Sequence, residues 1–110
     1  MTSVTIETTS NLQLMGAPTP GQLYRHIDGG YYRFLTQARH ADNLSVLNVY
    51  EHLWPFPNQM PWARPASEWA SRFVPVTQQE LEHAMRGNRK AAQTTVTEAK
   101  SRRRAAKARH

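Results

Sequence analysis

The chain has 110 residues, a length that suits one small domain with flanking segments. It contains no cysteine, which excludes disulfides and thiolate metal sites. No apolar run approaches the roughly 20 residues of a membrane-spanning helix, so the sequence predicts a cytoplasmic protein without a membrane partner.

The formal net charge of +6 comes from the end of the chain. From Met1 to Met85 five arginines face seven acidic residues, a balance of −2. Residues 86–110 carry nine Lys or Arg and one acid, a balance of +8. The basic character therefore belongs to a C-terminal tail and says little about the body of the protein.

Residues 1–20 are rich in Thr and Ser and end in a proline-glycine turn, which predicts an N-terminal arm. From Leu23 the sequence favours β structure: LYRHI, a turn at residues 28–30, and the alternating run YYRFLTQA. Gly29 and Gly30 supply the positive φ that a tight hairpin requires. In the second run Tyr32, Phe34, Thr36 and Ala38 share one face, and VLNVYEHL predicts a third strand.

The segment WPFPNQMP, residues 54–61, is predicted to be a loop because proline cannot donate to a strand ladder. Short strands are expected at residues 62–64 and 72–76. Thr77 and Glu80 match a capping box and predict a helix over residues 77–87. The basic tail, residues 88–110, is predicted to be helical or disordered because it lacks an apolar stripe for docking.

Short strands over residues 21–76 favour a small barrel or an open roll. Aromatic, basic and glycine residues recur along this region: Gly21, Tyr24-Arg25-His26, Gly29, Tyr32, Ala38-Arg39-His40, Val49-Tyr50, Leu53, Trp62-x-Arg64-Pro65 and Phe73. Over about residues 21–73 this pattern resembles the small bacterial and phage family called "domain of unknown function 1653". The resemblance implies a mainly β fold, a small SH3-like β-barrel or roll with a C-terminal α-helix and basic tail, and no assigned activity.

Two departures from the family pattern lie in loops. After His40 the family carries Glu and Thr, where this chain has Ala41-Asp42-Asn43-Leu44. Its Leu-Tyr-Gly turn is replaced by Leu53-Trp54-Pro55-Phe56-Pro57, a proline-stiffened loop that gives this member its own candidate partner surface.

Strands that close into a barrel would bring basic and aromatic side chains to one rim. The candidate ligand-binding residues are Tyr24, Arg25, His26, Arg39, His40, Tyr50, Trp62 and Arg64. Guanidinium groups bind phosphate or carboxylate and aromatic faces stack on bases, so the rim suits a nucleotide-like or other anionic small molecule, or nucleic acid. The alternative is that the aromatics fill the core while Arg25 and Arg64 pair with Asp28, Asp42, Glu51 or Glu68.

His26 and His40 raise the question of metal binding or acid-base catalysis. No third ligand stands at a recognisable spacing, so neither a metal nor another cofactor is predicted. A catalytic histidine would need a carboxylate within reach, and Asp28 and Asp42 are the nearest in sequence. The turn at residues 28–30 matches no phosphate-binding loop.

The proline-rich loop carries the candidate partner-binding residues Trp54, Phe56 and Met60. Rigid exposed aromatics are common anchors of protein interfaces. The alternative is a lid that folds over the end of the barrel.

The basic tail carries the candidate nucleic-acid-binding residues Arg86, Arg89, Lys90, Lys100, Arg102, Arg103, Arg104, Lys107 and Arg109. Such a run neutralises phosphates in a sequence-independent, salt-sensitive way, and it contains no aromatic residue for base stacking. The alternatives are a solvated tail or one that docks on an acidic protein.

These observations favour a non-enzymatic binding module whose tail associates with nucleic acid or an acidic partner. Two other functions stay open. One is a phage-type factor that binds a host protein through the proline-aromatic loop. The other is a nucleotide-like ligand-binding or hydrolytic protein that uses His26 or His40.

Overall fold

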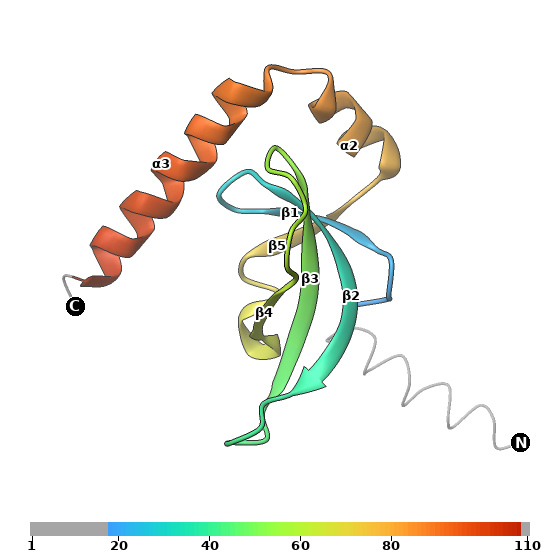
Figure 1. Ribbon diagram of the computed structural model, residues 1–110, viewed down its shortest axis with the longest axis vertical. Coiled ribbons are helices and arrows are strands. Elements are labelled where there is room, and N and C mark those ends of the chain that lie inside the picture. The colour runs from blue at the N-terminus through green and yellow to red at the C-terminus, as the bar shows by residue number, and fades with distance from the viewer. Residues whose placement is uncertain (1–17, 109–110) are drawn as a thin grey trace, which may run out of the picture.

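The computed structural model describes residues 18–108 (Figure 1). Its strands are β1 (Leu23–His26), β2 (Tyr31–Arg39), β3 (Val46–Trp54), β4 (Trp62–Pro65) and β5 (Phe73–Val76). A 3-10 helix, Ala66–Glu68, separates β4 from β5, and the helices α2 (Gln78–Met85) and α3 (Arg89–Ala108) follow. Residues 1–17, most of the predicted N-terminal arm, lie outside the described residues.

The five strands form one antiparallel sheet in the order β4-β3-β2-β1-β5. β2 and β3 are the long central strands, and Figure 1 shows them curving together toward the hairpin that joins them. The mainly β fold with a C-terminal helix is therefore confirmed. The sheet is open, with β4 and β5 at its edges, so closure into an SH3-like barrel is not confirmed.

The alternation of β3 explains how one face of the sheet becomes the core. Its side chains at positions 48, 50, 52 and 54 are buried, while those between them are more exposed. On β2, Tyr32 and Phe34 are buried as the predicted face requires. Thr36 and Ala38 are exposed, because the register shifts after Phe34 and the strand then runs out beyond the core.

The main core is almost entirely aromatic: Tyr24, Tyr32, Phe34, Tyr50, Trp69 and Phe73. Trp69 follows the 3-10 helix and stacks on Phe73 with ring centroids 3.8 Å apart. The other rings meet edge to face, the arrangement that aromatic quadrupoles favour.

A second core joins the sheet to α2 through Leu23, Trp54 and Leu81. The capping box that starts α2 is present, since Glu80 N donates to Thr77 Oγ1 at 3.1 Å and Thr77 N donates to Glu80 Oε1 at 3.0 Å. This prediction from the sequence is confirmed.

The basic tail is helical, and it packs against the body. Ala92, Val96 and Ala99 lie on one side of α3, and Val96 is only 1% exposed. Gln93 Nε2 also donates to the carbonyl oxygen of Pro55 at 2.9 Å. The expectation that this segment lacks a docking face was wrong, because two alanines and one valine at helical spacing are enough to seat it. Within residues 18–108 no helix is long and apolar enough to cross a membrane.

Candidate functional site

A groove of about 890 Å³ lies between α3 and the segment that leads into β4. Its apolar lining includes Phe56, Met60 and Trp62, while α3 contributes Lys100 and Arg104. Trp62 is 54% exposed, and Lys100 Nζ lies 5.9 Å from the centre of its ring. The groove therefore combines accessible aromatic surface with positive charge.

His52 on β3 also lines this groove, and Phe56 packs edge-on against its ring at 5.4 Å. Burial of the His52 side chain, together with the nearby charge of Lys100, lowers its pKa to about 4. His52 is therefore a neutral aromatic wall of the groove at pH 7. Burial is also the main reason why the pKa of Lys100 is lowered.

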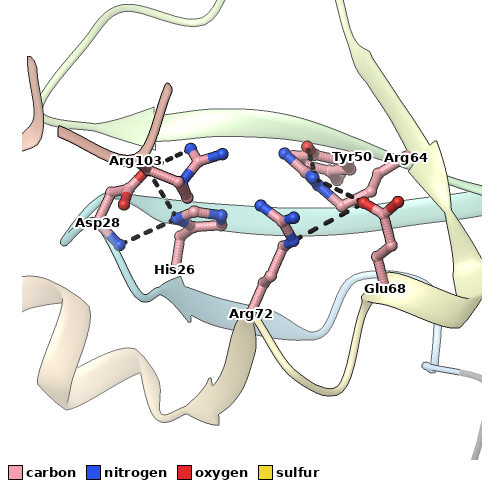
Figure 2. A network of polar contacts seen from close by, with 7 residues as sticks. All are labelled: His26, Asp28, Tyr50, Arg64, Glu68, Arg72 and Arg103. Carbon is pink, nitrogen blue, oxygen red and sulfur yellow. Dashed lines mark hydrogen bonds and ion pairs between the residues drawn. The ribbon is translucent and has the colours of Figure 1, made fainter. Parts of the chain in front are cut away.

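A polar network lies beside the aromatic core, and Figure 2 shows its left half built around Asp28. Asp28 N donates to His26 Nδ1 at 3.0 Å, and Arg103 from α3 donates to Asp28 Oδ2 at 2.6 Å. Burial alone would raise the pKa of Asp28, but the hydrogen bond from Arg103 and the neighbouring positive charges outweigh it and lower that pKa. The same ion pair ties the end of the basic helix to the first hairpin.

The right half of the network in Figure 2 is built around Glu68. Arg64 NH1 donates to Glu68 Oε1 at 3.1 Å, and Arg64 Nε donates to the Tyr50 hydroxyl at 3.3 Å. Arg72 Nε lies 3.7 Å from the same Glu68 oxygen. Two arginines from different segments thus share one carboxylate, which is 43% exposed.

The eight candidate ligand-binding residues do not form one rim. Tyr24 and Tyr50 are core residues, as the alternative interpretation holds, and His26 is 3% exposed. Arg25 is exposed, and Arg39 and His40 lie at the far end of β2. His40 Nδ1 accepts from the backbone amides of Asp42 and Asn43 there.

Four candidates from that set do lie at the two features described above. His26, Arg64 and the hydroxyl of Tyr50 belong to the polar network, and Trp62 lines the groove. The alternative pairing of Arg25 and Arg64 is partly realised, because Arg64 pairs with Glu68.

The candidate partner-binding residues have three different environments. Trp54 is 7% exposed and lies in the second core, so its role as an exposed anchor is wrong. β3 continues to the residue before the first proline of the loop, which carries Trp54 into the interior. Phe56 is half-buried in the groove, and Met60 is 81% exposed.

Most candidate nucleic-acid-binding residues are exposed: Arg86, Arg89, Lys90, Arg102, Arg104 and Lys107. Lys100 is half-buried beside Trp62, and Arg103 is paired with Asp28. Arg109 lies outside the described residues.

Sequence reasoning missed His52 and Arg72 as members of these sites. The alternation of β3 could have placed His52 on the buried face with Tyr50 and Trp54. No local pattern indicates Arg72, whose position depends on the turn that carries Trp69 beneath the sheet.

No curated protein and no solved structure gives a significant match to the chain. Residues 22–86 match the profile of the family described as "Protein of unknown function (DUF1653)". The match spans more than half of the chain and includes all five strands and α2. The chain therefore belongs to the DUF1653 family.

Proposed function

We propose that the protein is a non-enzymatic binding module for single-stranded nucleic acid. The observation that carries this proposal is the position of Lys100, Arg104 and Lys107, which recur along α3 at intervals of four and three residues. The first two line the groove that also contains Trp62 and Phe56. Phosphates would lie along this strip of cations while a base stacks on the aromatic surface, the combination typical of single-strand binding.

The packing of α3 supports this proposal further. A free basic tail offers phosphate contacts alone, whereas a docked α3 holds its cations beside aromatic rings of the body. The binding surface is then preorganised, so less entropy is lost when a ligand binds.

The surroundings of the two candidate catalytic histidines favour binding over catalysis. His26 Nδ1 accepts from a backbone amide and its ring is buried. His40 Nδ1 also accepts from backbone amides, at the opposite end of β2. Neither His26 nor His40 lines the groove, so neither is positioned as a general base there.

The proposal also includes an SH3-like arrangement of the strands and a cytoplasmic location. The return of β5 to pair with β1, together with the 3-10 helix between β4 and β5, supports an SH3-like arrangement of the sheet. A cytoplasmic location, in a bacterium or in the host of a phage, stays a prediction from composition.

Binding to a labelled, mixed-sequence single-stranded oligonucleotide tests the proposal by fluorescence anisotropy at several salt concentrations. The full chain should bind with a steep salt dependence. Changing Arg104→Gln and Lys107→Gln together should reduce the slope of log K against log salt by about 1.4, because each lost phosphate contact contributes about 0.7 on single strands. Trp62→Ala should weaken binding by about 5- to 150-fold and leave the slope unchanged.

The matched control changes Arg25→Gln and Arg39→Gln, which removes the same number of charges from exposed positions on the sheet. This variant should keep nearly the full affinity. If the full chain fails to bind at low salt, or if both double variants lose the same amount, the proposal is wrong. A loss in the α3 variant with no effect of Trp62→Ala would instead mean that α3 holds the phosphates and that no base stacks on Trp62.

Met60 favours a second candidate function, binding to a protein. It is 81% exposed on the proline-rich loop and lies beside the exposed ring of Trp62. Recovery of a host protein from lysate after nuclease treatment, lost in Met60→Ser, would support this second function. Loss of all recovery after nuclease treatment would count against it.

A further inference from the structure

We propose that His26, Arg64, Arg72 and Arg103 form a binding site for a phosphate group, separate from the groove between α3 and the proline-rich loop. Figure 2 shows these four side chains turned toward one space, with Asp28 on one side of it and Glu68 on the other. They arrive from β1, β4, the turn before β5, and α3. The proposal goes beyond nucleic-acid binding by the groove, because none of the four side chains lines that groove.

The hydrogen bond of His26 determines which of its nitrogens carries a proton. Nδ1 accepts from Asp28 N at 3.0 Å, so the proton of the neutral ring is on Nε2. Burial, helped by the charges of Arg64, Arg103 and Lys100, lowers the pKa of His26 to about 4 despite the opposing charge of Asp28. At pH 7 His26 Nε2 is therefore a hydrogen-bond donor.

This donor is buried and has no hydrogen-bond partner among the described residues. The His26 ring is 3% exposed, so bulk water does not reach Nε2. Buried donors are almost always paired, and one that is not calls for an explanation. A ligand with a hydrogen-bond acceptor bound at His26 Nε2 would explain this unpaired donor.

Two guanidinium nitrogens of the same cluster are also buried donors without a partner, like His26 Nε2. Arg72 NH1 and Arg103 Nε are both buried, and neither has a partner within the part of the chain that the structure describes. A water molecule would have to turn its own hydrogens away from three donors, whereas a phosphate group offers acceptor oxygens only. A metal cation is excluded because the cluster presents N–H groups to this space.

The charges of the cluster also favour an anion. Three guanidinium groups face two carboxylates, Asp28 and Glu68, while His26 is neutral. Lys100 adds another positive charge nearby, since it influences the pKa of both His26 and Asp28. The excess positive charge is partly desolvated, which strengthens its attraction for an anion.

Phosphate would enter the cluster by displacing arginine side chains, because the three unpaired nitrogens are themselves shielded from solvent. The exposed fractions of these side chains are 22% for Arg64, 23% for Arg72 and 32% for Arg103, so their outer parts already contact water. Bound phosphate would link the sheet to α3 through Arg103, so binding should also strengthen the docking of α3.

Isothermal titration and thermal unfolding of the full chain with inorganic phosphate, against chloride at equal ionic strength, test the site. We expect one phosphate per chain and a rise in Tm that chloride does not produce. Arg72→Gln should weaken phosphate binding by at least about tenfold, because it removes a charged forked donor. Arg72→Lys should restore only part of the affinity, since it keeps the charge and loses the fork.

Arg25→Gln is the matched control, because it removes one exposed arginine from β1 outside the cluster. It should bind phosphate as the unchanged chain does, and so should the Arg104→Gln, Lys107→Gln variant of the groove. An amide NMR spectrum of Arg72→Gln checks that the fold is retained. Absence of phosphate-specific binding, or equal losses in Arg72→Gln and Arg25→Gln, would overturn the proposal.

A pair of oligonucleotides distinguishes two sources of the phosphate group. If a 5′-phosphorylated strand binds more tightly than its 5′-hydroxyl form, and Arg72→Gln removes the difference, the site takes the end of a nucleic acid. If the two strands bind alike while inorganic phosphate still binds, the site takes a small phosphate ligand. Both outcomes support the site itself.

Discussion

Val96→Asp is expected to release α3 from the sheet while the sheet stays folded. Val96 is 1% exposed, and a Cβ placed on Gly29 would lie 3.6 Å from Val96 Cγ2, so the valine packs directly on the first hairpin. The change removes buried apolar surface worth about 1.5–3 kcal/mol and places an unpaired carboxylate in its position. Amide hydrogen exchange should show a loss of protection of about 100-fold or more along α3.

The remaining contacts of α3 are too few to compensate. They include one hydrogen bond from Gln93, the ion pair of Arg103 and the contact of Lys100 with Trp62. These polar contacts are few and only partly buried, and a released α3 frays because an isolated helix of 20 residues is marginal in water. The aromatic core contains no residue of α3, so protection in β1, β2 and β3 should persist.

Thr97→Asp is the control for this prediction, since it introduces the same side chain at an exposed neighbouring position. It should leave exchange along α3 unchanged. Slow exchange of the α3 amides in Val96→Asp would show that the helix is held by something other than Val96. Release of α3 should also abolish the groove, which links this result to the proposed nucleic-acid binding.

Local patterns in the sequence predicted the sheet and the start of α2 well. Alternation identified β2 and β3 as strands, and the glycine turn identified the first hairpin. The capping box of Thr77 depends only on residues three apart, so short-range reasoning was sufficient for it.

The docking of α3 could not be predicted in the same way. Its apolar stripe consists of one valine between alanines, which is weaker than the pattern that signals a docked helix. The ion pair that fixes its end joins Arg103 to Asp28, residues 75 positions apart. A contact of that separation depends on the complete fold.

The predicted rim failed as a single site because it assumed that the strands close into a barrel, whereas the sheet is open. His26 lies near the start of β2, and Arg39 and His40 lie near its end. A strand of nine residues spans roughly 30 Å, so these side chains cannot meet around one ligand. The candidate phosphate site instead combines residues from four separate segments.

The free energy of unfolding is expected to fall as the pH is lowered from about 6.5 to about 4. His26 and His52 are both buried and both have a pKa of about 4, with desolvation as the first cause. The charges of Lys100 near both rings, and of Arg64 and Arg103 near His26, contribute to this lowering. Asp28 and the Trp54 backbone act in the opposite direction. In the unfolded chain both imidazoles take up a proton near pH 6.5.

Between these pH values the unfolded state binds up to two more protons than the folded state, so stability rises with pH. The contribution is complete above about pH 6.5 and is lost as the pH falls toward about 4, at up to about 2.7 kcal/mol per pH unit. Urea unfolding at pH 7, 6, 5 and 4 measures this slope. His52→Phe should reduce it by about half, whereas His83→Gln, at an exposed position on α2, should leave it unchanged. A free energy of unfolding that stays constant over this range would show that burial does not lower the pKa of these two rings.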